Sequence, residues 1–320
     1  MRRPFDAVVM HDFFVDRLLY AGSLTRLVDS VAAKAGRGGG GIHGIPQEDI
    51  RGGNAVNLAH ALARLGLRTL LITHSDAIHE QMVRNPFEAL DAEVRIKPKP
   101  PGLTVALEGK VNVMLGHTSG AGDFGPELLD SDDWEAMRAC HVVCSVNWAA
   151  NKKGTTLLAA LREKLGNEKV IFFDPADFRD RLRDFARLLT LIRKQKLVDW
   201  MSLNEQEATE AARILGVKAT HPREKCRELA EKLRTAVDVH TAKGSFSSDG
   251  GKVTAVPTKS IEARRLTGAG DVWDAGSIYG RLKNYTDSER LDFANAAAGL
   301  YLTSREPSPP DLRAVLRAQH

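Results

Sequence analysis

Short runs of apolar residues alternate with longer amphipathic segments along most of the chain. The runs of strand length lie at 7–10, 69–73, 141–146, 169–173 and 198–203. Segments with apolar residues at helical spacing lie between them, at 54–65, 155–165 and 205–215. Such alternation is typical of a parallel sheet with helices on both faces. The pattern therefore predicts an α/β fold.

Two segments interrupt this alternation. Residues of about 17–45 contain a helical stretch at 24–35 and then a glycine-rich run at 36–41, and residues of about 97–118 resemble a hairpin that turns near Gly109. We expect both to form a lid over the carboxyl ends of the strands, where open α/β sheets bind ligands. The apolar face of this hairpin would either cover the substrate or pair with a second copy in a homodimer. Its residues are Val105, Leu107, Val111, Val113 and Leu115.

Composition and charge narrow the possible partners. The chain has 320 residues and a formal net charge of +4, without a long basic run. This favours small anionic ligands over nucleic acid. No apolar stretch is long enough to cross a membrane. Because Cys140, Cys144 and Cys226 form neither a disulfide framework nor a metal pattern, we expect reduced thiols and a cytoplasmic protein.

The chemistry is concentrated in the segment 266–276, where a turn of small residues opens a helix. The backbone N–H groups of Gly268, Ala269 and Gly270 are unobstructed, and such groups at a helix N-terminus bind anions. Asp271 follows in the first helical turn, where it can take a proton from an attacking hydroxyl. Anion donors beside a base predict phosphoryl transfer.

Two other glycine-rich segments are weaker candidates. The run 36–41 matches the G-x-G-x-x-G spacing of dinucleotide-binding turns, but a helical pattern precedes it where a strand is required. Residues 120–123 repeat Gly-Ala-Gly-Asp, yet Phe124, Gly125 and Pro126 follow, so no helix can start at once. We assign catalysis to the copy at 268–271 and leave the first copy a possible contact with substrate.

Another helix start lies at 51–59, after Gly52 and Gly53. These glycines allow a polyhydroxylated ligand to approach the backbone, and Asn57 offers a donor and an acceptor to hydroxyls. Taken alone, the segment is explained equally well as an Asn-capped helix after a tight turn.

Together, the two motifs resemble those of the ribokinase-like (PfkB) carbohydrate kinases. The N-terminal motif is Gly52-Gly53 with Asn57, and the C-terminal motif is 267–271 followed by Ala275-Gly276. Their order and separation fit the family over nearly the whole chain. The resemblance implies a single kinase domain over 1–320, built as a three-layer sandwich with a mostly parallel central sheet and a small β lid.

The resemblance also implies roles for individual residues. Asp271 would be the catalytic base, and Asp16 would bind substrate hydroxyls with Gly52, Gly53 and Asn57. Asn204 and Glu207 match an N-x-x-E motif associated with magnesium and phosphate, with Glu207 as the metal residue, although Asn204 also suits a plain N-cap. The residues implied for the nucleotide are Asn204, Thr241, Gly244, Thr267 and Asn295. ATP is then the co-substrate and Mg²⁺ the cofactor, and a monovalent cation is possible.

Several positions depart from the family pattern. Arg265-Leu266 stands where the family usually has Asp-Thr, which changes the local charge by two units and would favour a phosphorylated substrate or alter monovalent-ion binding. The loop 242–245 lacks a glycine immediately after Thr241, and 174–179 only approximates the aspartate-to-arginine spacing. The reaction type is therefore better defined than the substrate.

We expect an ATP-dependent kinase that phosphorylates a hydroxyl of a sugar or sugar-like molecule. A nucleoside or phosphosugar kinase of the same fold is an alternative. A non-catalytic ligand-binding relative is another, but such a protein has no need to retain Asp271.

Overall fold

A large mixed sheet forms the body of the protein. The computed structural model describes residues 4–108, 113–264, 267–306 and 308–319. The sheet in these residues has nine strands. Their spatial order is β13 (Val253–Pro257), β12 (Gly244–Ser248), β11 (Ala236–His240), β10 (Trp200–Asn204), β9 (Val170–Asp174), β8 (Val142–Val146), β1 (Ala7–Met10), β4 (Thr69–Ser75) and β5 (Ala92–Pro98).

The strand order places a topological switch point at β1. In this spatial order, all neighbouring strands from β11 through β10, β9, β8, β1 and β4 to β5 pair in parallel. In this sheet, as far as the structure describes it, β12 and β13 are the strands that pair antiparallel with their neighbours. The chain proceeds from β1 to β4 on one side and returns to β8 on the other. In open α/β sheets, ligands bind outside the carboxyl ends of strands at such a point. The end of β1 is therefore where a site is expected.

Helices cover both faces of the sheet, as side chains of β1 show. Val8 and Met10 pack into one buried cluster, and Ala7 and Val9 into another, because successive strand residues point to opposite faces. Helices that contribute to the first cluster are α4 (Ser131–Ala139), α5 (Gly154–Leu165), α6 (Leu182–Gln195), α7 (Glu205–Ile214) and α8 (Pro222–Leu233). Those of the second are α2 (Asn54–Arg64), α3 (Glu80–Arg84), α9 (Ala269–Leu282), α10 (Asp287–Thr303) and α11 (Leu312–Ala318).

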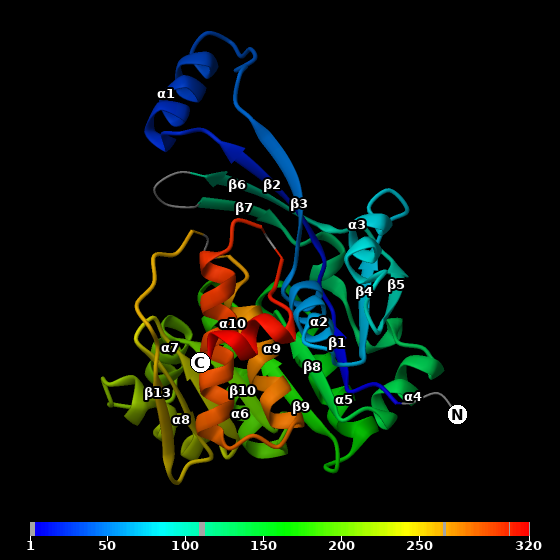
Figure 1. Cartoon of the computed structure of the whole chain (residues 1–320). Helices are drawn as coiled ribbons and strands as arrows, with labels where there is room; N and C mark the ends of the chain where they lie inside the picture. The colour runs from blue at the N-terminus through cyan, green and yellow to red at the C-terminus, as the bar shows by residue number, and fades with distance from the viewer. Residues whose placement is uncertain (1–3, 109–112, 265–266, 307, 320) are drawn as a thin grey trace.

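A small sheet lies above the body as a lid, together with α1 (Leu24–Ala35), which projects furthest from it (Figure 1). Its strands are β3 (Gln47–Gly52), β2 (Phe14–Tyr20), β6 (Gly102–Glu108) and β7 (Val113–His117). Asp16 pairs with Thr104, whereas Arg17 pairs with Val105. The apolar face that contains Val105 therefore lies on the opposite side of the lid from Asp16.

The predicted α/β fold and the separate lid sheet are confirmed, and the three cysteines are free and buried. The hairpin turn near Gly109, Val111 and the Arg265-Leu266 pair lie outside the described residues. None of the helices in the described ranges is long and apolar enough to cross a membrane.

Candidate active site

Asp12 organises the switch point at the end of β1. Its carboxylate accepts hydrogen bonds from the backbone N–H of Asn54 and of Ala55, both at 2.9 Å, and so caps the first turn of α2. The side-chain amide of Asn147, just after β8, donates a third at 2.7 Å. Asp12 is fully buried, and burial raises its pKa. Sequence reasoning missed this residue.

Gly52 and Gly53 make room for neighbouring groups between the lid and α2. A Cβ at Gly52 would lie 2.0 Å from a carboxylate oxygen of Asp16. At Gly53, a Cβ would lie 2.7 Å from the carbonyl oxygen of Asp12, and the φ of +105° is one that other residues rarely adopt. The lid carboxylate of Asp16 is thus close to the start of α2, and burial raises its pKa.

The predicted anion loop is the start of α9. Gly268 is its N-cap with φ +86°, and a Cβ there would lie 2.8 Å from the hydroxyl oxygen of Tyr301. That hydroxyl donates to the carbonyl oxygen of Thr267 at 3.1 Å, which fixes the loop against α10. The first N–H groups of a helix have no intrahelical acceptor, so those of Ala269 and Gly270 are available to an anion.

Asp271 is held between two helices. The side-chain amides of Asn54 and Asn57, both on α2, donate to its two carboxylate oxygens at 2.9 and 3.0 Å. The residue is 6% exposed. Burial, followed by the charge of Asp174, raises the pKa of Asp271 well above its usual value, and the two amide donors act in the opposite direction. A carboxylate with a raised pKa beside an anion site is suited to act as a general base.

Two further carboxyl groups lie behind Asp271. Asp174, at the end of β9, is hydrogen-bonded to Asp274 on α9, and burial raises the pKa of both groups. Asp274 also accepts a hydrogen bond from the Ser202 hydroxyl at 2.5 Å. Two buried carboxyls in contact cannot both ionise easily, so the charge of Asp174 adds to burial in raising the pKa of Asp274. The negative charges of Asp174 and Asp12 are among the reasons that Asp271 binds its own proton more tightly.

Asn204 and Glu207 form a capping box at the start of α7. The Asn204 side-chain oxygen accepts from the N–H of Glu207 at 3.0 Å, and the Glu207 carboxylate accepts from the N–H of Asn204 at 2.9 Å. The Asn204 amide also donates to Glu207 at 2.7 Å. Burial, and then the charge of Asp174, raises the pKa of Glu207 to about 8. The structure thus shows the N-cap alternative for Asn204, with a buried acid beside it.

Of the other residues predicted for the nucleotide, Thr241 and Gly244 lie at neighbouring strand ends, whereas Thr267 precedes α9 and Asn295 lies on α10. Thr241 follows β11 directly, and its hydroxyl oxygen accepts from the N–H of Lys243 and of Gly244 at 3.1 Å, closing a short loop. Asn295 on α10 accepts from the Trp273 indole N–H at 2.9 Å. Its amide nitrogen is buried and, within the described residues, has no hydrogen-bond partner.

The first Gly-Ala-Gly-Asp copy, at 120–123, has a different setting. Residues Ser119–Asp123 form a 3₁₀ turn at the root of the lid. The Asp123 carboxylate is 55% exposed and pairs with Lys153 at 2.9 Å and Lys99 at 3.1 Å. These surface ion pairs keep the pKa of Asp123 below its usual value. Its structure therefore offers neither a buried base nor an anion site at a helix start.

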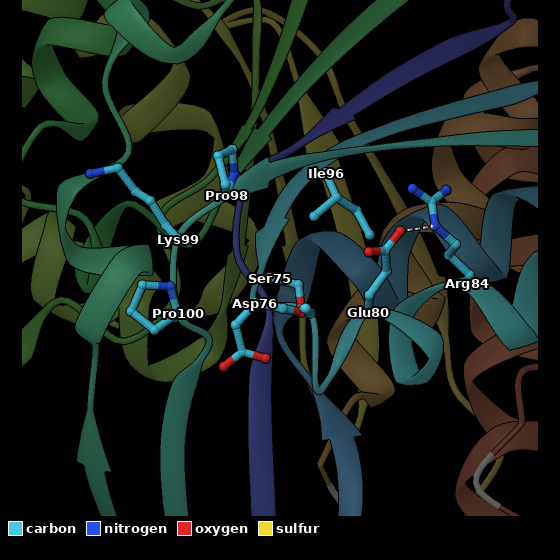
Figure 2. Close-up of a pocket in the computed structure, with 9 residues that line it drawn as sticks. Ser75, Asp76, Glu80, Arg84, Ile96, Pro98, Lys99 and Pro100 are labelled. Carbon is cyan, nitrogen blue, oxygen red and sulfur yellow. Dashed lines mark hydrogen bonds and ion pairs between the residues drawn. The ribbon is translucent and has the colours of Figure 1, made fainter.

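A cavity of about 420 Å³ lies beside the lid root, at the ends of β4 and β5 (Figure 2). None of the predicted site residues lines it. Its charged groups already have partners: Glu80 pairs with Arg84 at 2.6 Å, and Lys99 pairs with Asp123. Asp76 accepts from the N–H of His79 at 2.9 Å. The cavity is therefore separate from the site around Asp271.

Sequence reasoning missed several residues that complete the site. They are Asp12, Asn54, Asn147, Asp174 and Asp274. Asp12 and Asp174 each stand at the carboxyl end of an apolar run, where α/β proteins bind ligands, and this position was a usable signal. Nothing in the sequence pairs Asn54 with Asp271, because 217 residues separate them.

Known proteins share the sequence pattern and the fold of this chain. The model of the pfkB family of carbohydrate kinases matches residues 28–313. The chain is 25% identical to the 5-dehydro-2-deoxygluconokinase of Clostridium perfringens over 272 residues, which cover 80% of this chain and 79% of that protein. It is 27% identical to the ribokinase of Haemophilus influenzae over 267 residues, covering 79% and 81%. The structure of Arabidopsis thaliana ribokinase complexed with ribose and ATP superimposes with a TM-score of 0.73 at 19% identity, covering 99% of both chains.

Proposed function

Because this chain belongs to the pfkB family of carbohydrate kinases, we propose that it transfers the γ-phosphoryl group of ATP to a hydroxyl of a sugar or sugar-like molecule. The observation that supports this most is the pairing of a buried carboxylate with unobstructed amides on one helical turn. Asp271 is that carboxylate, and the amides belong to the turn that begins α9. The base and the anion donors are thus fixed relative to each other by the helix itself.

In the proposed reaction, Asp271 accepts the proton of the attacking substrate hydroxyl. The hydroxyl oxygen forms a bond to the γ-phosphorus as the bond from that phosphorus to the β–γ bridging oxygen breaks, and ADP leaves. The amides of Gly268, Ala269 and Gly270 hold the charge on the transferred group. One such backbone donor contributes on the order of 3 kcal/mol to transition-state stabilisation. Asn54 and Asn57 orient the two carboxylate oxygens of the base.

Asp16 is proposed to position the substrate from the lid side. Its carboxylate accepts hydrogen bonds from sugar hydroxyls, and Gly52 and Gly53 leave the space in which a ligand approaches the backbone. Asp16 and Thr104 lie on the same face of the lid, and the exposed apolar residues lie on the opposite face. Substrate binding would then bring the lid and the start of α2 together and exclude water.

The nucleotide is proposed to lie along the ends of β10 and β11, near Asn204, Thr241, Gly244, Thr267 and Asn295. The acidic groups on this side of the sheet fit Mg²⁺. Burial and the negative charge of Asp174 raise the pKa of Glu207 to about 8, and a divalent cation would offset the repulsion between these two carboxylates. Glu207 would hold the ion with the help of phosphate oxygens. The ion supplies charge neutralisation on those phosphates.

A substrate panel tests the reaction. We would incubate the protein with ATP or ADP and with neutral sugars, sugar phosphates, inositols or nucleosides, and identify products by ³¹P nuclear magnetic resonance. We expect a new phosphomonoester from ATP and a neutral sugar. A product only from nucleosides or phosphosugars would favour those alternatives. Thermal stabilisation by ATP without transfer to any compound would contradict a catalytic role.

A lid variant tests the proposed substrate contact. Asp16→Asn keeps the shape but removes the charge, so we expect KM for the sugar to rise about tenfold or more while the Kd for ATP is unchanged. Asp49→Asn is the matched control, because Asp49 is an exposed lid carboxylate that pairs with Arg17 at 2.7 Å. Equal KM values for the two variants would show that Asp16 does not bind the substrate.

The exposed side of the lid is proposed to pair with a second copy. Leu103 and Leu115 are 48% and 60% exposed there, on the face opposite Asp16. Leu115→Lys should then yield monomers in light scattering. Met114→Lys is the control, because Met114 lies on the same strand but faces the other side. A monomeric wild type, or a Leu115→Lys variant that still dimerises, would contradict this interface.

A further inference from the structure

A second cavity, of about 380 Å³, lies at the end of the sheet opposite the candidate site. Trp200, which begins β10, and Ala236, which begins β11, both line it, whereas Asn204 and Thr241 lie at the other ends of these strands. The lid lies at the opposite end of the body from the beginning of β10 (Figure 1). The cavity, which Trp200 lines, is therefore away from the lid. Arg281 lines it near the end of α9, ten residues after Asp271, or roughly 15 Å along the helix.

An unused hydrogen-bond donor lies in the wall of this cavity. The Trp200 side chain is 1% exposed, and within the described chain its indole N–H has no acceptor. Two guanidinium groups lie over the same ring, with the Cζ of Arg281 at 4.8 Å and the Cζ of Arg290 at 5.1 Å from the ring centroid. A buried donor without a partner is costly, so an acceptor supplied by a ligand would restore this loss.

The two arginines differ in how their charges are compensated. Arg290 is buried and forms ion pairs with Asp238 at 2.5 Å and with Asp287 at 3.0 Å. Arg281 forms no ion pair within the described ranges, and the positive charge of Arg290 acts on it. Burial, and then that neighbouring charge, lowers the pKa of Arg281, whereas the carboxylates of Asp238, Asp287 and Asp199 act in the opposite direction.

The other charged residues that line the cavity are one lysine and two aspartates. Lys252 also lines it and, among the described residues, makes no ion pair. Asp249 lines it as well, but its carboxylate accepts from the N–H of Gly251 at 3.1 Å in a tight turn. Asp287 is already paired with Arg290. Arg281 and Lys252 thus line the cavity without an ion-pair partner among the described residues.

We propose that this cavity is a binding site for a small oxyanion, with a carboxylate or phosphate group as the recognised chemistry. One oxygen accepts the indole N–H of Trp200, and the guanidinium of Arg281 binds the group through charged hydrogen bonds. Lys252 adds a positive charge at the rim. The site is independent of phosphoryl transfer, because it lies at the opposite ends of the strands from Asp271.

The indole N–H signals give a direct test. The chain has four tryptophans, so ¹⁵N-tryptophan labelling gives four indole signals, and the absence of one in Trp200→Phe assigns Trp200. We would titrate the full chain with inorganic phosphate, and separately with citrate, at constant ionic strength. We expect the Trp200 signal to shift and saturate with at least one of the two, which also distinguishes a phosphate from a carboxylate ligand.

Two variants decide whether the shift reports this site. Arg281→Gln should raise the dissociation constant measured from the Trp200 signal by about tenfold or more. Lys283→Gln is the matched control, because Lys283 lies just after α9 but does not line the cavity, and it should retain the wild-type constant. A Trp200 signal that stays still with both anions would overturn the proposal, even if Trp273 near the anion loop responds. An unchanged constant in Arg281→Gln would overturn it as well.

If Trp200→Phe fails to fold, the Trp200 signal can be assigned by sequential backbone experiments in the wild type. The variants at 281 and 283 retain the indole and supply the comparison. Asp271→Asn should leave the Trp200 titration unchanged, since the base lies at the other end of α9. A loss of the Trp200 response in that variant would place the anion at the active site instead.

Discussion

Gly-Ala-Gly-Asp occurs at 268–271 and again at 120–123, and the two copies adopt different structures. The later copy begins a helix, and its aspartate is 6% exposed and bound by two asparagine amides. The earlier copy is a 3₁₀ turn whose aspartate pairs with two surface lysines. Burial raises the pKa of Asp271, whereas ion pairing lowers that of Asp123. Four identical residues thus yield a buried, amide-bound carboxylate in one place and a surface salt bridge in the other.

The difference arises from the residues that follow each copy and from the partners that other elements supply. After Asp271 the chain continues as α9, so the preceding amides remain free for an anion. After Asp123 the chain extends through Phe124 toward Pro126. Asn54 and Asn57 are partners of the later copy, because α2 packs against α9. A short motif therefore gains its chemistry from its surroundings.

The largest expected difference is between the two aspartates. Asp271→Asn removes the base and should lower kcat/KM roughly 10²–10⁴-fold. Asp123→Asn should leave kcat/KM within error of the wild type, because it removes only exposed ion pairs. Steady-state kinetics with the substrate identified by the panel would measure both. Comparable losses in the two variants would mean that our choice between the copies is wrong.

A smaller difference is expected between the glycines of the two copies. Gly268→Ala forces a side chain into a φ of +86° and against the Tyr301 hydroxyl, so the anion loop must shift. We expect kcat to fall about tenfold or more. Gly122→Ala places its Cβ 2.5 Å from the Thr118 hydroxyl oxygen, the end of a side chain that can rotate, and kcat should be unaffected. Circular dichroism would verify that both variants fold.

The pH dependence of kcat should respond to the partners of Asp271 alone. The base must be ionised, so kcat falls as the pH decreases through its pKa. Asn54→Ala removes a donor that stabilises the carboxylate, which raises the pKa of Asp271, and the acidic limb of the profile should move to higher pH. Lys153→Ala removes a partner of Asp123 and should leave the profile in place. A shift to lower pH in Asn54→Ala would show that the limb belongs to another group.

The smallest expected effect is on stability. The folded-state pKa of Asp271 is raised, so the native state binds a proton that the unfolded state releases, and stability decreases as the pH rises toward the folded-state pKa. Asp271→Asn removes that cost, so its Tm should exceed the wild-type Tm at pH 8, and the gain should diminish toward pH 4. Asp123→Asn should show no such gain. Thermal melts across this pH range would measure the gain in Tm. Equal gains at pH 4 and pH 8 would argue against a destabilising charge at Asp271.

The sequence was sufficient for local structure and for elements that repeat a simple pattern. The apolar run 7–10 coincides with β1, and the helical spacing of 54–65 predicts α2 to within a residue. Helix α1 spans the predicted 24–35, although none of its residues is buried. These elements are predicted from the spacing of apolar residues and from nearby glycines, and both can be read in one stretch of sequence.

The contacts that complete the candidate site were not predictable in this way. Asp12 resembles any polar residue after a strand, yet it caps α2 and binds Asn147, which lies 135 residues away in the sequence. The pairing of Asp174 with Asp274 depends on the order of strands in the sheet, which one sequence does not specify. Long-range contacts between strand ends therefore had to come from the structure.

The hydrogen bond between Asn54 and Asp271 also has a consequence for biosynthesis. The two residues are separated by 217 positions, so a ribosome that adds 5–20 residues per second completes Asp271 roughly 10–45 s after Asn54. During this interval the helix that carries Asn54 and Asn57 has been made, but Asp271 has not. The nascent chain therefore passes through a stage in which the lid strands exist but the contact between Asn54 and Asp271 cannot yet form.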